Sequence, residues 1–345
     1  MSLATAIKTG DVGQLPSRRD EDWRWTDLRG LIRQMPPAAP QGRAWAWDNP
    51  VSGQTDMTVC SVNGTGHTDL EVAEGEERFV GWRFLSATAA TSHNAEFWVD
   101  VAAGAKLTLI ESHEGAQSGY LSNVSVNIRL AEGAFMERII FAEDHAEGIS
   151  VVDANVALAP GASYAQTVLT FGARRQRIET RVGHPGEGAS VRLDGVYLLR
   201  DQRHADLTTV VTHGGLDGAT SQLTKGVVRD QARGVFQGRI VVEKGADGTE
   251  ARMGHHALIL SDKAEVDAKP ELLIFADDVQ CAHGNTVGAL DEAAIFYARQ
   301  RGMPQDVARA MLTEAFVGEV VDRIEHEGAR EIARAWIAEQ LRMAQ

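Results

Sequence analysis

The chain has 345 residues, with 34 Lys plus Arg against 48 Asp plus Glu, which gives a formal net charge of −14. At 43% hydrophobic and 24% charged residues, the composition is that of an ordinary globular protein, long enough to bury a large core without disulfides. The acidic balance excludes non-specific binding to nucleic acid or to an anionic membrane surface, because both depend on clustered Lys and Arg.

The two cysteines, Cys60 and Cys281, are too few for a disulfide framework or for an autonomous four-cysteine zinc or iron–sulfur site. The first residues lack the apolar segment of a secretory signal, and no apolar run approaches the ~18 residues of a membrane span. These features predict a cytoplasmic protein with reduced thiols and no membrane segment.

Residues 1–98 are predicted to form an N-terminal helical and irregular region. Apolar residues at helical spacing predict a short helix over Glu21–Gln34, and a proline-rich stretch at residues 35–42 then predicts an extended linker. The region also holds most of the tryptophans, which we interpret as apolar plugs over an open end of the main core rather than as ligand-stacking groups. They are Trp23, Trp25, Trp45, Trp47, Trp82 and Trp98.

Residues 99–284 alternate apolar and polar positions in short runs, as in Lys106–Glu111, and glycine recurs between the runs. This texture is typical of β-strands joined by tight turns. A Gly-Ala pair recurs here with spacings of 29, 28, 27, 30 and 27 residues, and the pairs begin at Gly104, Gly133, Gly161, Gly188, Gly218 and Gly245. A helix-free repeat of this length favours a β-helix, in which each repeat is one coil. An antiparallel sandwich is the alternative fold.

A stack of coils has an open strand edge at each end, which must be capped or paired with another chain. Residues 285–345 change to helical periodicity and are predicted to form a C-terminal helical domain. One helix is expected from Asp291 to Gln300 with a stop at Gly302. A second is expected from Pro304, and a third from about Ala329.

Among residues that could carry chemistry, Cys281 and His283 are the most informative. If they lie on a strand, the thiol and the imidazole project from the same face. Imidazole is a common metal ligand and thiolate is another, but two ligands cannot complete a tetrahedral site. The alternative is that Cys281 is a buried small hydrophobe and His283 a hydrogen-bonding residue at a strand end.

Other motifs point to no catalytic function. The chain has no GxxxxGK[ST], GxSxG, HExxH or CxxC motif, so it is predicted not to be an ATPase or a hydrolase of these classes. His255 and His256 would project from opposite faces of a strand and could not chelate together. His204 and His213 are expected to be surface or turn residues.

The C-terminal half contains four runs that resemble a known family, namely Gln202–Asp206, Gly234–Gly238, Lys269–Leu272 and Asp277–Gly288. On these runs the chain resembles the SufB/SufD family of scaffold proteins in iron–sulfur cluster assembly, and it is more similar to SufD than to SufB. An N-terminal run, Pro16–Thr26, is also similar to an early segment of the family.

The resemblance implies a mainly β fold with a right-handed parallel β-helix between N-terminal and C-terminal helical parts. It implies a non-catalytic scaffold that pairs with a SufB-like subunit through its last strands and docks a SufC-like ATPase through its C-terminal helices. It further implies that His283, with Cys281 beside it, helps to hold a transient iron–sulfur cluster or iron at the subunit interface, with no cofactor bound stably by the isolated chain.

Some alternatives stay open at this point. The isolated chain could form a homodimer. Other functions known for β-helices are a carbohydrate-active enzyme, which would need charged side chains stacked on one face, and a self-assembling structural protein.

Overall fold

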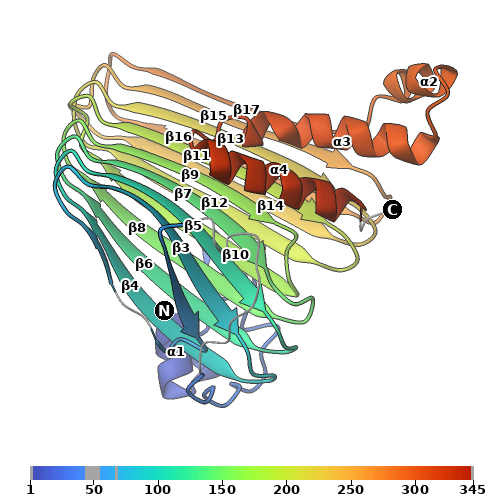
Figure 1. Ribbon diagram of the computed structural model, residues 1–345, viewed down its shortest axis with the longest axis horizontal. Helices are drawn as coiled ribbons and strands as arrows, with labels where there is room; N and C mark the ends of the chain where they lie inside the picture. Colours follow the sequence, from blue (N-terminus) through green and yellow to red (C-terminus); the bar gives the residue numbers. More distant parts are fainter. Residues whose placement is uncertain (1–2, 43–54, 67–68, 343–345) are drawn as a thin grey trace.

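The computed structural model describes residues 3–42, 55–66 and 69–342. In this part of the chain, two parallel sheets face each other, and successive strands alternate between them (Figure 1). The predicted parallel β-helix is therefore confirmed, and the antiparallel sandwich is wrong. Each coil contributes one strand to each sheet, so every strand pairs with the strand two places along the chain.

The nine-stranded sheet contains the odd-numbered strands, which are β1 (Met57–Val62), β3 (Glu77–Ser86), β5 (Lys106–Gly115), β7 (Phe135–Glu143), β9 (Ser163–Thr170), β11 (Ser190–Leu199), β13 (Ala219–Val228), β15 (Glu250–Ile259) and β17 (Gln280–Gly288). The eight-stranded sheet contains β2 (Leu70–Val72), β4 (Ser92–Val101), β6 (Leu121–Leu130), β8 (Ile149–Leu158), β10 (Arg175–His184), β12 (His204–His213), β14 (Arg233–Val242) and β16 (Glu265–Ile274).

The Gly-Ala repeat marks the corner that leads from each even strand into the next odd strand. Gly104, Gly133, Gly161 and Gly188 have φ between 63° and 75°, a left-handed conformation that glycine adopts without steric cost. The alanine after each of them is buried at the corner, and successive corners are hydrogen-bonded, as from the Gly133 amide to the Pro160 carbonyl at 3.2 Å. The small residues let stacked turns lie close together.

The last two pairs depart from this pattern. In the fifth pair the left-handed residue is Asp217 instead of Gly218, and after the sixth pair Asp247–Thr249 separate Gly245-Ala246 from β15. The repeat thus predicted the coil correctly, while small insertions adjust individual corners.

The predicted boundaries of the β region were wrong at both ends. Strands β1 to β3 and most of β4 lie before residue 99, in the region that was expected to be helical or irregular, and β17 continues past residue 284 to Gly288. Strand β3 is buried on both faces over its second half, so it lacks the alternation that marks a half-buried strand. Trp82, Phe84 and Phe97 fill the interior of these first coils, with ring centroids 4.8–5.5 Å apart.

The tryptophans do not form one plug. Trp82 is inside the core, Trp98 is partly exposed on the outer face of β4, and Trp23 stacks on Arg177 with the guanidinium carbon 4.5 Å from the ring centroid. Trp45 and Trp47 lie outside the described residues.

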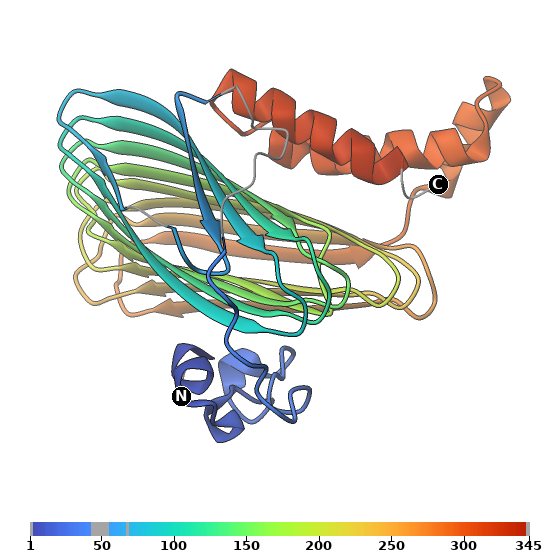
Figure 2. The same cartoon turned by 60° about the horizontal axis from the view of Figure 1, so that its bottom comes forward.

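The N-terminal segment covers the outer face of the eight-stranded sheet, on the opposite side of the solenoid from the C-terminal helices (Figure 2). It contains α1 (Leu3–Thr9) and two short 3₁₀ helices, Val12–Gln14 and Glu21–Trp23. The predicted helix over Glu21–Gln34 is wrong beyond Trp23, because the segment turns to bury Leu28 and Ile32 against β6 and β8.

The three predicted C-terminal helices are confirmed as α2 (Glu292–Gln300), α3 (Gln305–Val321) and α4 (Glu327–Arg342). Asp291 caps α2 by accepting a hydrogen bond from the Ala293 amide at 2.8 Å. Helices α3 and α4 pack on the outer face of the nine-stranded sheet, whereas α2 projects past its edge (Figure 1). None of the helices in the described part of the chain combines the length and apolar character that a bilayer span requires.

Candidate functional site

The candidate site lies on β17, the last strand of the nine-stranded sheet. Within the described residues, β17 pairs with β15 on one side only, and β16 pairs only with β14. The last coil therefore presents unpaired backbone edges and the inner face of its side chains to solvent. We call this end of the solenoid the open rim and define it by β16 and β17.

Cys281 and His283 both belong to the inward-facing row of side chains at the rim. In the parallel register, Cys281 lies next to Ala251 and His283 next to Met253, and both of these β15 residues are buried. On β17 itself His283 is exposed and Cys281 is half-buried, because no further coil covers these two side chains. The expectation that the thiol and imidazole share one face is confirmed, and neither is sealed inside the core.

The Cys281 thiol is shielded on one side by the core of the last coils, where it packs against a buried apolar cluster that includes Phe236 and Met253. This burial raises the pKa of the Cys281 thiol, and a backbone hydrogen bond from Ala251 opposes the rise. The raised pKa favours the protonated thiol, and a metal ion would have to displace the proton to bind the sulfur.

The donors at the rim do not form a complete metal site. In the described part of the chain, no three His, Cys, Asp or Glu side chains are grouped so that they could hold a metal ion. Cys281 and His283 supply at most two donors, so an ion bound between them would need ligands from solvent or from a second molecule.

His255 lies one coil below the rim and was correctly predicted to face away from His256. It is fully buried, stacks on Phe236 with ring centroids 4.8 Å apart, and is bonded to Tyr197 and Asn285. Burial lowers the pKa of His255 from 6.5 to about 4, so the ring is neutral at pH 7. Sequence reasoning missed these partners, because Tyr197 is 58 residues and Asn285 30 residues away.

The prediction that His204 and His213 are surface or turn residues was wrong. Both are buried, His213 stacks on His184 at 4.3 Å between ring centroids, and His204 is hydrogen-bonded to the Trp25 carbonyl at 3.1 Å. These two histidine side chains face the interior of the solenoid or the N-terminal segment, and the local sequence indicates neither kind of burial.

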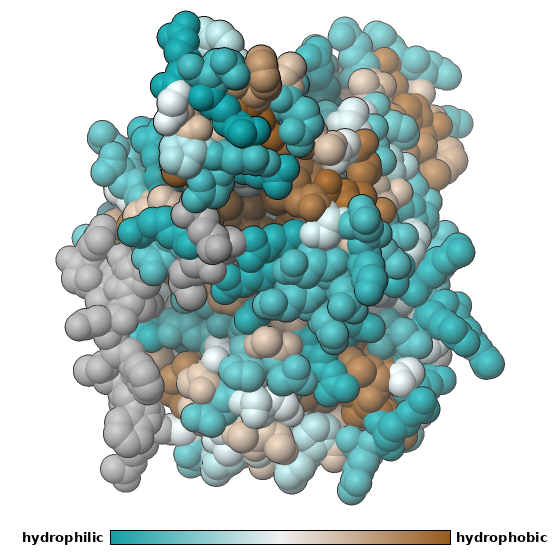
Figure 3. Space-filling model, turned by 90° about the vertical axis from the view of Figure 1, so that its right-hand side faces the viewer, coloured by the Kyte–Doolittle hydropathy of each residue, from teal (hydrophilic) through white to brown (hydrophobic). Residues whose placement is uncertain are grey.

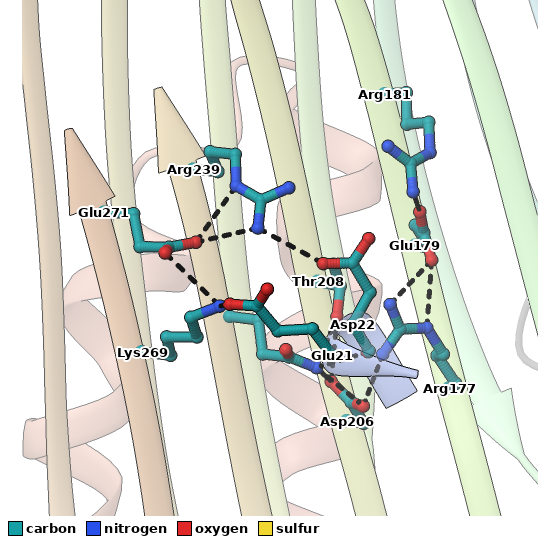
Figure 4. Close-up of polar contacts among 11 residues, drawn as sticks. Glu21, Asp22, Arg177, Glu179, Arg181, Asp206, Thr208, Arg239, Lys269 and Glu271 are labelled. Atoms are coloured by element: carbon teal, nitrogen blue, oxygen red, sulfur yellow. Dashed lines mark hydrogen bonds and ion pairs between the residues drawn. The ribbon is translucent and has the colours of Figure 1, made fainter. Parts of the chain in front are cut away.

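The N-terminal run meets three of the four C-terminal runs that carry the family resemblance, Gln202–Asp206, Gly234–Gly238 and Lys269–Leu272, on the outer face of the eight-stranded sheet (Figure 4). Buried Asp206 accepts hydrogen bonds from Thr26 at 2.5 Å and from Arg177 at 2.7 Å, and the Gln237 amide bonds to the same carboxylate. One buried carboxylate thus connects β10, β12 and β14 to the N-terminal segment.

A second set of ion pairs continues this contact to the rim strand β16. Lys269 lies 2.7 Å from Glu21, and Arg239 bridges Glu271 at 2.9 Å and Asp22 at 3.2 Å (Figure 4). These pairs are partly exposed, so each contributes little energy by itself. Together they place the N-terminal segment beside the rim without covering its inner face.

The C-terminal helices also expose an apolar surface. Phe296 and Tyr297 on α2 are 62% and 60% exposed, and Val307 and Met311 on α3 are also exposed. Viewed from the side on which α2 projects, apolar surface is prominent in the upper part of the molecule (Figure 3). Large exposed aromatic side chains in one region are typical of protein–protein interfaces.

Comparison with known proteins gives the family. A family model described as "SUF system FeS cluster assembly, SufBD core domain" matches residues 84–316. An iron–sulfur cluster assembly protein SufD of Escherichia coli K12 is 31% identical over 244 residues, covering 70% of this chain and 58% of that protein.

Two further relatives are named as SufBD family proteins of iron–sulfur cluster assembly. One from Synechocystis is 31% identical over 208 residues and covers 60% of this chain and 46% of its own, and one from Mycobacterium leprae is 24% identical over 96% of this chain and 92% of its own. The chain thus matches about half the length of the first two relatives. Since the family model covers more than half of the chain, the predicted family is confirmed: this chain belongs to the SufBD core domain family of the SUF system, and SufD is among its named relatives.

Proposed function

We propose that this chain is a non-catalytic scaffold subunit in the assembly of iron–sulfur clusters, and that the open rim forms the assembly site together with a SufB-like subunit. The observation that carries the proposal is the exposed inward-facing pair Cys281 and His283 on an unpaired parallel strand. The relatives named for iron–sulfur cluster assembly support it.

The rim has the properties of a surface that is completed by another chain. In any coil that is followed by another coil, the inward-facing row of side chains would be buried. At the rim, Val287 on β17 and Ile274 on β16 are exposed. A second subunit that added a strand at this edge would cover these apolar residues and satisfy the backbone groups. A second copy of this chain would meet the same requirement when the partner is absent.

The cluster is cargo at this site and is held only in passing. Two donors from this chain and further thiolates from the partner would complete the coordination that iron requires. We propose that the bound cluster is released to a recipient protein, because a site divided between two subunits opens when they move apart.

His283→Ala should reduce, by at least about tenfold, the iron and sulfide retained by the complex of this chain with its SufB-like and SufC-like partners. The complex would be purified from its host and reconstituted with ferrous iron and sulfide, and the metal measured after gel filtration. Thr286→Val is the matched control, because Thr286 is on the same strand but faces outward. Equal iron retention in the His283→Ala and wild-type complexes would refute the proposal.

We also propose that α2 and the start of α3 dock a SufC-like ATPase. Phe296→Ala should weaken binding of that ATPase by at least about tenfold, as expected for an exposed aromatic anchor of an interface. Binding would be measured with the purified partners by calorimetry, with Gln300→Ala on the same helix as the control. If Phe296→Ala binds the ATPase as tightly as the wild type does, the docking surface lies elsewhere.

A further inference from the structure

A buried chain of hydrogen bonds runs from the interior of the solenoid to the open rim. The Tyr197 hydroxyl on β11 lies 2.8 Å from Nε2 of His255 on β15, and Nδ1 of His255 lies 2.7 Å from Oδ1 of Asn285 on β17. Tyr197 and His255 are fully buried, whereas Asn285 is exposed. The chain therefore connects a closed interior to a side chain that solvent or a ligand can reach.

The chemistry of the three groups determines the direction of these bonds. The Asn285 amide oxygen can only accept, so Nδ1 of His255 must carry the ring proton. A neutral ring has one N–H, which leaves Nε2 as an acceptor for the Tyr197 hydroxyl. Stacking of His255 on Phe236, with an interplanar angle of 2°, prevents the ring from turning.

The same bonds orient the Asn285 amide. Because Oδ1 is held by His255, the amide NH₂ group is on the side away from His255 and keeps its two donors. Asn285 is in the same inward-facing row as Cys281 and His283, and alternate residues of a strand are roughly 6.6–6.8 Å apart. A group bound at Cys281 and His283 would extend toward this donor.

We propose that Asn285 donates a hydrogen bond from its amide nitrogen to an anionic sulfur, either sulfide or thiolate, of the cluster assembled at Cys281 and His283. His255 and Tyr197 act as positioning residues, since they touch only Asn285 and one another in this chain of bonds. The inference rests on the proposed function. Hydrogen bonds to cluster sulfur stabilise its negative charge and raise the reduction potential of the cluster.

Asn285→Asp tests the donor directly. Aspartate keeps an oxygen for the His255 N–H but replaces the NH₂ group with a second acceptor that repels anionic sulfur. In the complex with the SufB-like and SufC-like partners, reconstituted with ferrous iron and sulfide, we expect at least about tenfold less cluster to be retained. We also expect a changed visible circular dichroism spectrum and a lower reduction potential of what remains. Tyr197→Phe should change the spectrum in the same direction by a smaller amount.

The controls separate this role from a structural one. Thr286→Val should leave retention, spectrum and potential unchanged, and Asn285→Asp should leave the melting temperature and subunit composition of the unloaded complex unchanged. If the loaded Asn285→Asp complex had the circular dichroism spectrum and the reduction potential of the wild type, the proposal would be overturned. A loss confined to the stability of the unloaded complex would overturn it as well. Normal loading of the His283→Ala complex would instead refute the proposed function, so the two failures are distinguishable.

Discussion

Arg138→Met should lower the free energy of unfolding by about 3–5 kcal/mol, because it leaves a buried carboxylate without its counter-charge. Arg138 on β7 and Glu111 on β5 form two bonds, at 2.6 Å and 2.8 Å, and both side chains are completely buried. Arg138 also donates to Gln166 at 3.2 Å. The substitution therefore removes three hydrogen bonds and the compensation of one charge from the interior of the solenoid.

The chain contains a matched control for this effect. Arg129 and Asp100 form a similar two-bond pair between neighbouring coils, at 2.5 Å and 2.7 Å, but their side chains are 61% and 36% exposed. Arg129→Met should cost less than about 1 kcal/mol, since solvent screens an exposed pair. Denaturant unfolding at pH 7 gives the free energy of unfolding of the wild type and both variants. An equal loss of this free energy in Arg138→Met and Arg129→Met would contradict the burial argument.

The difference between Arg138→Met and the wild type should also depend on pH. Burial alone would raise the pKa of Glu111, but the Arg138 charge and the His113 hydrogen bond outweigh it and lower the pKa from 4.5 to about 2. A carboxyl with a lowered pKa in the folded state contributes stability above about pH 4.5, and this contribution is lost as the pH falls toward 2. The stability gap between the two proteins should therefore narrow across this range.

Trp336→Ala should cost about 3–5 kcal/mol and loosen α4 from the nine-stranded sheet. The Trp336 ring stacks on Phe171 and contacts Phe141, each at 5.9 Å between centroids, and its indole N–H donates to Glu143 at 2.7 Å. Removal of the indole leaves a cavity in the contact between helix and sheet. It also removes the hydrogen bond that Glu143 accepts from the indole N–H, and burial raises the pKa of Glu143.

Hydrogen exchange resolved by peptide, together with denaturant unfolding, distinguishes local from global loss. We expect faster exchange in α3 and α4 and little change in the strands of the first coils, because each coil is stabilised mainly by its neighbours. Phe296→Ala is the control, since this exposed side chain should change stability by less than about 0.5 kcal/mol. Unchanged exchange in α4 of the Trp336→Ala protein would contradict the assigned anchor.

The sequence by itself determined the features that depend on local conformation. The Gly-Ala corners at Gly104, Gly133 and Gly161 predicted the coil, because a left-handed turn favours glycine, which adopts this conformation without steric cost. The ends of α2 followed from Asp291 and Gly302 for the same reason, since caps act within a few residues of each other. Alternation likewise placed Cys281 and His283 on one face of a strand.

Only the tertiary structure decided where the β-helix begins and what the rim contains. Trp82 was predicted from the sequence to be a plug, yet together with Phe97 it fills the first coils, and the sequence did not show this because a strand buried on both faces has no alternation. The chain of bonds from Tyr197 through His255 to Asn285 joins residues on β11, β15 and β17 of one sheet and passes over β13. Such contacts arise from the stacking of coils about 30 residues apart, and no local pattern in the chain encodes which side chains meet across them.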